Sequence, residues 1–145
     1  MTDVANTDNG QLRGARAVEV RVAAELDNLA VLRTLIGAFG TFEDLDFDVV
    51  ADLRLAVDEA CTRLIRSAVP GSTLLLVIDP QEDVVVIDAS TTCDTLDIVE
   101  PGSFSWHVLS SLTDDLRTFS DGQGPAEEGL VVGISMTTRR ASSPR

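Results

Sequence analysis

Apolar residues recur along residues 46–68 at the spacing of an amphipathic helix. At about 100° per residue, one face of this helix collects five small or aliphatic side chains, Leu53, Val57, Ala60, Leu64 and Ala68. A second stripe, roughly a third of a turn away, collects the charged residues Asp52, Glu59, Arg63 and Arg66. Pro70-Gly71 then ends the pattern. The segment is therefore predicted to be one long helix with a buried face and a charged flank.

The rest of the pattern predicts two further helices and five strands. Helical spacing covers 26–39, where Asp27 or Asn28 could cap the start and Gly40 the end, and also covers 104–112. Alternating or continuous apolar runs predict strands at 17–23, 73–78, 83–89, 116–119 and 130–138. The order β-α-α-β-β-α-β-β indicates an α/β (α+β) fold in two layers, and pattern alone leaves other two-layer α+β arrangements open.

Domain boundaries follow from composition. Residues 1–16 are polar and contain glycine, so they are predicted to be a mobile N-terminal tail. Residues 17–140 are predicted to be one folded domain, and 141–145 a C-terminal tail. No apolar run approaches the roughly 18 residues of a membrane span, and the start lacks the basic and apolar regions of a signal peptide. We expect a cytoplasmic protein.

Charge excludes several functions. The formal net charge of −13 argues against sequence-independent nucleic-acid binding, which needs a basic face. All 11 basic residues are arginine, so there is no lysine for a phosphate-binding P-loop.

Cys61 and Cys93 are too few for a zinc site. We expect Cys61 in the core and Cys93 in an exposed loop, where a redox-sensitive thiol is conceivable.

Three segments carry a resemblance to a known family. They are Leu55-Ala-Val-Asp-Glu59-Ala-Cys-Thr-Arg63, Val85-Val-Ile-Asp88-Ala-Ser, and Gly102-Ser-Phe-Ser-Trp106-His-Val-Leu running into Asp114-Asp115. With the order of elements, they make residues 17–140 resemble the GHKL, or Bergerat, ATPase fold. Within it the chain is most similar to the anti-sigma factor and serine-protein kinase family of the RsbW type, above all to its anti-sigma-F members. The resemblance implies a mixed sheet covered by helices on one face.

The family implies a function and residue roles. Its members hold an alternative, stress-type sigma factor away from RNA polymerase and use ATP with Mg²⁺ to phosphorylate a competing STAS anti-anti-sigma protein. By resemblance, Glu59 would be the general base, Asp88 would bind adenine, and Gly102, Ser103 and Ser105 would lie against the phosphates. Arg33, with Asn28 and Asp27, would form the surface for which sigma and STAS proteins compete. A homodimer through the sheet edge near the first strand is also implied.

The same segments depart from the family at three points. Arg63 stands where the family has an asparagine that binds Mg²⁺, and a guanidinium has no lone pair to offer a metal. The loop after Asp88 lacks the two glycines of Asp-x-Gly-x-Gly, and the segment that would close over ATP is short. No metal ligand is therefore assigned.

Alternatives remain at the level of function and of single residues. The protein is either a sequestering module with a decayed ATP site, or a kinase in which Arg63 contacts phosphate directly. A third alternative is an interaction domain with a partner other than a sigma factor. Glu59 and Arg63 also fit a plain i, i+4 ion pair, and Arg33 a solvated surface arginine.

Overall fold

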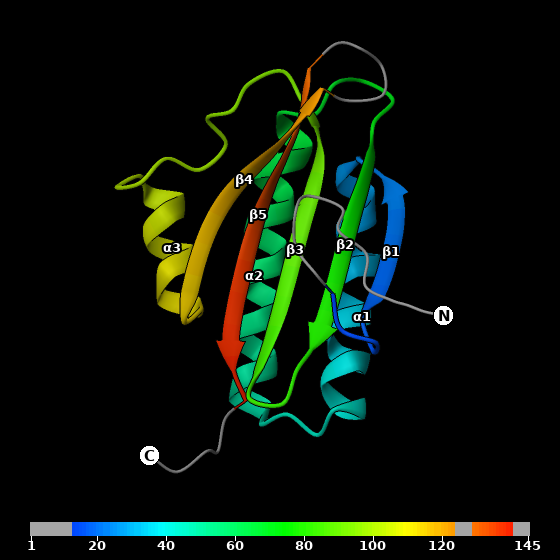
Figure 1. Ribbon diagram of the computed structural model, residues 1–145, viewed down its shortest axis with the longest axis vertical. Coiled ribbons are helices and arrows are strands. Elements are labelled where there is room, and N and C mark those ends of the chain that lie inside the picture. The colour runs from blue at the N-terminus through cyan, green and yellow to red at the C-terminus, as the bar shows by residue number, and fades with distance from the viewer. Residues whose placement is uncertain (1–12, 124–128, 141–145) are drawn as a thin grey trace.

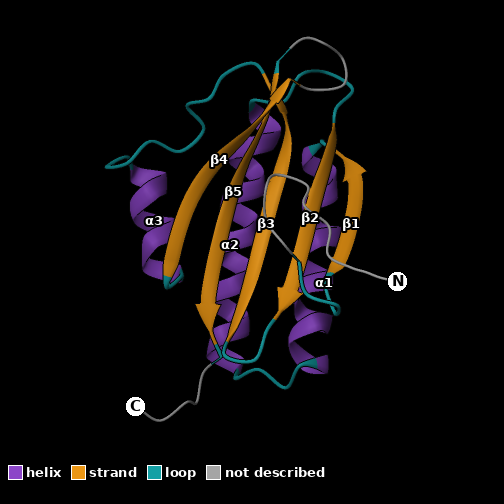
Figure 2. Ribbon diagram, in the orientation of Figure 1, coloured by secondary structure: helices purple, strands orange, loops and turns teal. Residues whose placement is uncertain are grey.

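One sheet and one layer of helices make up the chain, of which this computed structural model describes residues 13–123 and 129–140. The helices lie against a single face of the sheet (Figures 1 and 2), as predicted. In chain order the elements are β1 (Val18–Ala23), the 3-10 turn η2 (Leu26–Asn28), α1 (Leu29–Phe42), α2 (Phe47–Arg66), β2 (Thr73–Pro80), β3 (Val84–Cys93), α3 (Phe104–Leu112), β4 (Asp115–Gln123) and β5 (Leu130–Arg139). The predicted order of helices and strands is therefore confirmed.

The sheet is antiparallel throughout its described strands, so the expected mixed sheet is wrong. Its strand order is β1-β2-β3-β5-β4, and each neighbouring pair is antiparallel. Two helices lie between β1 and β2 in the chain. Each successive element reverses the direction of the chain, so β2 runs antiparallel to β1. β3 and β4 flank the single helix α3 and do run in the same direction, but β5 lies between them. No parallel pair can form in this order.

The core lies between the sheet and α2. Alternate residues of the strands face the helices, and each is at most 2% exposed: Leu74, Leu76, Ile78, Val85, Ile87, Ala89, Val132, Ile134 and Met136. From α2, the predicted face is buried at Leu53, Val57, Ala60 and Leu64. Ala68 is the exception, because α2 ends at Arg66 and Ala68 makes an isolated bridge with Cys93. None of the described helices is both long and apolar enough to cross a membrane.

Some helix and strand boundaries differ from the predicted ones for physical reasons. α1 does not end before Gly40 but runs on to Phe42, and Gly40 is a buried contact with Val50 rather than a cap. β3 extends beyond its predicted end through Ser90–Cys93. The polar residues there show no apolar strand pattern, but their backbone still pairs with β5, because this pairing does not require apolar side chains. The predicted tails 1–16 and 141–145 lie mostly outside the described residues. The described part, 13–16, contacts the domain through Arg13 with Glu19 and through the amide of Gly14, which donates to Asp79.

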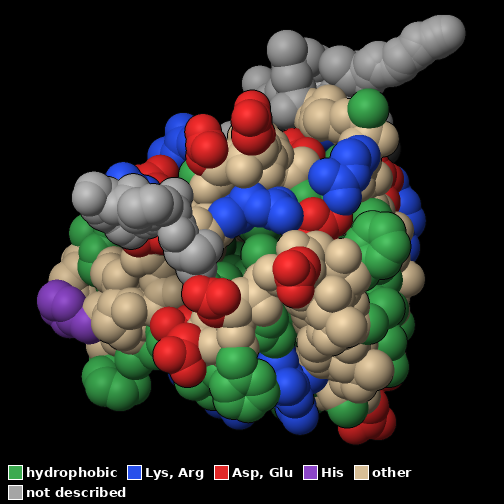
Figure 3. Space-filling view, turned by 90° about the horizontal axis from the view of Figure 1, so that it is seen from below, with side chains coloured by type: hydrophobic (Ala, Val, Ile, Leu, Met, Phe, Trp, Pro, Cys, Tyr) green, Lys and Arg blue, Asp and Glu red, His purple; other side chains and the backbone are tan. Residues whose placement is uncertain are grey.

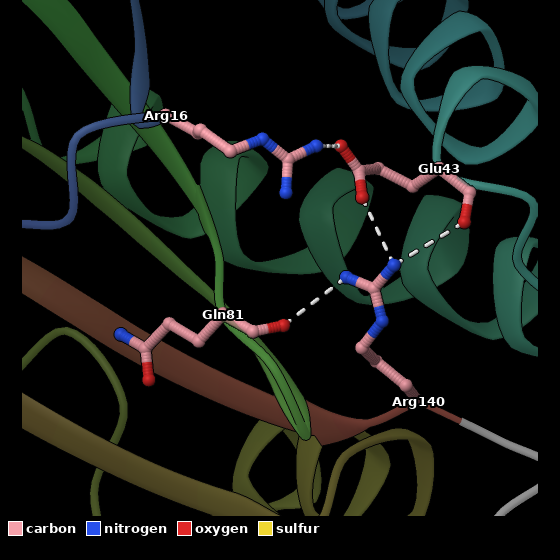
Figure 4. A network of polar contacts seen from close by, with 4 residues as sticks. All are labelled: Arg16, Glu43, Gln81 and Arg140. Atoms are coloured by element: carbon pink, nitrogen blue, oxygen red, sulfur yellow. Dashed lines mark hydrogen bonds and ion pairs between the residues drawn. The ribbon is translucent and has the colours of Figure 1, made fainter.

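A buried carboxylate in the α1–α2 turn is the centre of a polar network that links four segments of the chain (Figure 4). The Glu43 side chain is 4% exposed and forms ion pairs with Arg16 and, at 2.9 Å, with Arg140. Arg140 also donates to the carbonyl oxygens of Glu43, at 3.3 Å, and of Gln81, at 3.2 Å. The α1–α2 turn is thereby joined to the segment before β1, to the β2–β3 turn and to the end of β5.

The two glycines of α1 are expected to respond in opposite ways to alanine. A Cβ on Gly40 would lie 3.1 Å from Val50 Cγ1 and closer still to Cγ2, whereas one on Gly37 meets only Arg54 Nη1 at 3.9 Å. Overpacking costs about 1–3 kcal/mol, and the gain in helix propensity is at most about 1 kcal/mol. We therefore expect Gly40→Ala to lower the free energy of unfolding in urea by about 1–2 kcal/mol. Gly37→Ala should raise it, and a stabilised Gly40→Ala variant would contradict the close approach of α1 and α2.

Candidate functional site

Glu59 is the centre of a small polar cluster between α2 and α3. Its Oε2 accepts a hydrogen bond from Arg63 Nε at 3.1 Å and another from Ser105 Oγ at 2.7 Å. Arg63 is one helical turn further along α2, so the pair follows from the helix alone. Ser105 comes from the first turn of α3. The structure thus brings together Glu59, Arg63 and Ser105, three of the residues that the sequence singled out.

The turn before α3 supplies the other predicted phosphate contacts. Gly102 has φ 89°, a left-handed conformation that favours glycine. Ser103 is the N-cap of α3, and its hydroxyl accepts from the amide of Trp106 at 3.2 Å. This hydroxyl therefore already satisfies one of the first-turn donors that an anion would use. The turn lies beside Glu59, and nucleotide contact by Gly102, Ser103 and Ser105 stays a prediction.

Asp88 lies away from this cluster, on the helix-free side of the sheet. Its neighbours in β3, Ile87 and Ala89, are both fully buried in the core under the helices, so Asp88 faces the other way. There it lines a cavity of about 450 Å³ with Asp79 and Arg117. The structure does not bring Asp88 together with Glu59, and the adjacent inward position holds Ala89, which has no polar side chain. The apolar run Val84–Ile87 is continuous, so the sequence carries no alternation from which this orientation could have been predicted.

These residues do not fit a Mg²⁺-bound nucleotide. Oε2 of Glu59 is already bonded to a guanidinium and a hydroxyl, and the guanidinium stands at the position expected for the metal ligand. Among residues 13–123 and 129–140, no three His, Cys, Asp or Glu side chains are grouped so that they could hold a metal ion. The arrangement acts chemically as a polar link that holds the first turn of α3 against α2.

The predicted partner-binding residues lie on and before α1. Arg33 Nε donates to Asp58 Oδ1 at 2.9 Å, and the two side chains are 46% and 37% exposed. Asp27 is exposed in η2, and the Asn28 side chain donates to the carbonyl oxygen of Ala23 rather than capping α1. Sequence reasoning did not single out Asp58, because it lies about 100° around α2 from the charged stripe at Glu59. Arg33 thus joins α1 to the side of α2 that carries Asp58, whereas Glu59 contacts α3 through Ser105.

Both cysteines are buried, which corrects the expectation for Cys93. Cys61 and Cys93 are each 0% exposed, and Cys93 ends β3 instead of lying in a loop. Burial, with a smaller effect of neighbouring Asp58, raises the pKa of Cys61 from its ordinary 9.0 to about 12. Burial, with Asp94, raises the pKa of Cys93 to about 11. Both thiols stay protonated at neutral pH, and this disfavours redox chemistry at Cys93.

Comparison with known proteins identifies relatives along the whole chain. Two proteins named anti-sigma-F factor RsbW, from two strains of Mycobacterium tuberculosis, are each 64% identical over 145 residues, which is all of this chain and 86% of theirs. A serine-protein kinase RsbW of Bacillus pumilus is 19% identical over 146 residues, with 85% of this chain and 86% of that protein covered. No protein-family model matches the chain. At 64% identity over its full length, the chain belongs to the anti-sigma-F factor RsbW family.

Proposed function

We propose that this protein is an anti-sigma factor that sequesters an alternative, stress-type sigma factor of the sigma-F class in the cytoplasm. A competing STAS anti-anti-sigma protein then releases the sigma factor. The observation that carries the proposal is the identity of 64% over all 145 residues to proteins named anti-sigma-F factor. Sequestration needs a complementary surface and no chemical step, so it does not depend on an intact ATP site.

The contacts of Glu59 support a degenerate ATP site. A general base needs a free lone pair within reach of its target hydroxyl. Here the chain's own Ser105 hydroxyl donates to Glu59 Oε2 at 2.7 Å and takes up one of the two carboxylate oxygens. Arg63 shares the same oxygen and puts a positive charge where the metal ligand is expected. We therefore assign Glu59 a structural role.

The alternative is an active ATP-dependent serine kinase that phosphorylates its STAS partner. It is favoured by the relative named serine-protein kinase, at 19% identity, and by the closeness of Glu59 to the N-terminus of α3. In that case Arg63 would contact phosphate directly, since a guanidinium binds phosphate well. Gly102, Ser103 and Ser105 would line the phosphates, and Asp88 would have no place beside them.

Homodimerisation is a further part of the proposal. β1 is an edge strand of the described sheet, because it pairs only with β2. Its outer backbone groups could pair with a second copy, although the charged Glu19 and Arg21 on it are of the kind that discourages edge pairing. Residues 17–140 would form the dimerising domain.

The test combines binding with phosphate transfer. The purified protein is titrated calorimetrically with a sigma-F-class factor, alone and with a STAS competitor, and STAS protein incubated with it and Mg²⁺-ATP is analysed by mass spectrometry. We expect stoichiometric sigma binding, release by the competitor and no added phosphate on serine. Phosphoserine on the STAS protein would instead establish the kinase, provided that Glu59→Gln abolishes it. Absence of sigma binding would refute sequestration and favour a different partner.

A further inference from the structure

Two phenylalanines at the α1–α2 turn are exposed to an unusual degree. Phe42 ends α1 with 80% of its surface exposed, and Phe47 begins α2 with 86%. Phenylalanine is among the residues most often buried, and a single ring buries 150–250 Å² in a core or an interface, in rough numbers. Neither ring belongs to the hydrophobic core of the described residues, whereas Leu45 between them packs against it. The fold does not use these two rings.

Acidic residues lie next to the two rings in the sequence. Asp44, Asp46 and Asp48 are all exposed, and the stretch from Thr41 to Asp48 contains no basic residue. Glu43 points inward to Arg16 and Arg140 and does not add to the exposed charge. Seen from below in Figure 3, this end of the molecule shows hydrophobic side chains next to both acidic and basic ones. We call Phe42, Asp44, Asp46, Phe47 and Asp48 the acidic–aromatic tip.

The backbone of the tip is held in one conformation. The amide of Asp44 donates to Thr41 O at 3.1 Å, and that of Leu45 to Gly40 O at 3.0 Å. Asp44 adopts φ 57°, a left-handed conformation that a non-glycine residue keeps only where its surroundings impose it. The Glu43 ion pairs fix the turn from inside. A surface that is already ordered loses little entropy on binding.

We propose that the acidic–aromatic tip is a second docking surface for the sequestered sigma factor, which it contacts through a basic segment that also carries apolar side chains. The identity of this partner rests on the proposed function. The partner is inferred from charge complementarity. A sigma factor binds DNA and therefore exposes Lys and Arg side chains, which can pair with the three exposed aspartates of the tip. The two rings supply the desolvated anchors that dominate the energy of most interfaces.

Calorimetric titration with the sigma factor tests the tip directly. The variants are the double variant Phe42→Ser/Phe47→Ser, the double variant Asp46→Asn/Asp48→Asn and, as control, Leu96→Ser, an exposed apolar residue 53% accessible in the loop before α3. We expect the phenylalanine variant to raise Kd at least tenfold, which is about 1.4 kcal/mol, and Leu96→Ser to leave it unchanged. The aspartate variant should also raise Kd, and its Kd should depend less on salt concentration than that of the wild type. Because all five side chains are exposed, every variant should fold.

The outcomes separate this inference from the proposed function. If wild-type protein binds the sigma factor and the phenylalanine and aspartate variants bind it equally well, the docking inference is wrong and sequestration stands. If wild-type protein does not bind, both fail. Sedimentation velocity of the free proteins tests whether the tip is instead a contact between two copies of the chain. If the wild type is a dimer and the phenylalanine variant is a monomer, the tip is such a contact and the inference is overturned.

Discussion

Replacing Glu43 with alanine is expected to lower the free energy of unfolding by about 3 kcal/mol, the lower end of the range for breaking a buried ion pair. The Glu43 side chain is 4% exposed and forms ion pairs with Arg16 and Arg140, whose side chains are 58% and 25% exposed. Without it, Arg140 retains a positive charge in a partly buried site, whereas Arg16 can turn to water. Urea denaturation followed by circular dichroism measures the loss, and the melting temperature should fall by roughly 6–12 °C.

Two comparisons show whether the loss comes from the ion pairs. Glu82→Ala removes an exposed acid from the neighbouring β2–β3 turn and should change stability by less than about 0.5 kcal/mol. The double variant Glu43→Ala/Arg140→Met should recover part of the loss, because it removes both the buried acid and the charge left without it. A loss of less than about 1 kcal/mol in Glu43→Ala, or strict additivity in the double variant, would mean that the cluster contributes little.

Elements with a strong periodic pattern were predictable from the sequence. The face of α2 at Leu53, Val57, Ala60 and Leu64 is buried as the 3.6-residue period requires, and α3 has the predicted bounds, 104–112. The i, i+4 spacing likewise predicted the contact of Glu59 with Arg63. In each case the information is local, since a single helix determines which side chains share a face.

Contacts between distant segments were not predictable in the same way. Because β5 lies between β3 and β4, every neighbouring pair in the sheet is antiparallel, and no local pattern encodes the pairing of β3 and β5 residues that are 37 to 55 positions apart. Glu43 and Arg140 are 97 residues apart, so their ion pair carried no sequence signal. Ser105 was placed near Glu59 by resemblance to a family and not by its own pattern. The side of the sheet on which Asp88 lies was not predicted, because the apolar run before it is continuous and shows no alternation.

Reversing the charge at Arg33 is expected to weaken sigma-factor binding by about 30-fold or more, near 2 kcal/mol, while leaving the fold intact. The Arg33–Asp58 pair is exposed on both sides, at 46% and 37%, so it contributes at most about 1 kcal/mol to stability. A glutamate at this position would face Asp58 and present two like charges to the partner. Calorimetric titration of Arg33→Glu with the sigma factor, together with a thermal melt of the free variant, measures both quantities.

Arg117→Glu is the matched control for charge reversal. Arg117 is also an exposed arginine that pairs through Nε with an aspartate, Asp115 Oδ2 at 3.5 Å, but it comes from β4 and not from the helix layer. Both variants change the net charge by the same amount, so general repulsion or attraction affects them equally. If sigma binding of Arg33→Glu stays within a factor of two of wild type, about 0.4 kcal/mol, Arg33 is a solvated surface residue. If Arg117→Glu weakens binding as much as Arg33→Glu does, the effect is one of net charge, and the surface formed by Asp27, Asn28 and Arg33 is not the binding site.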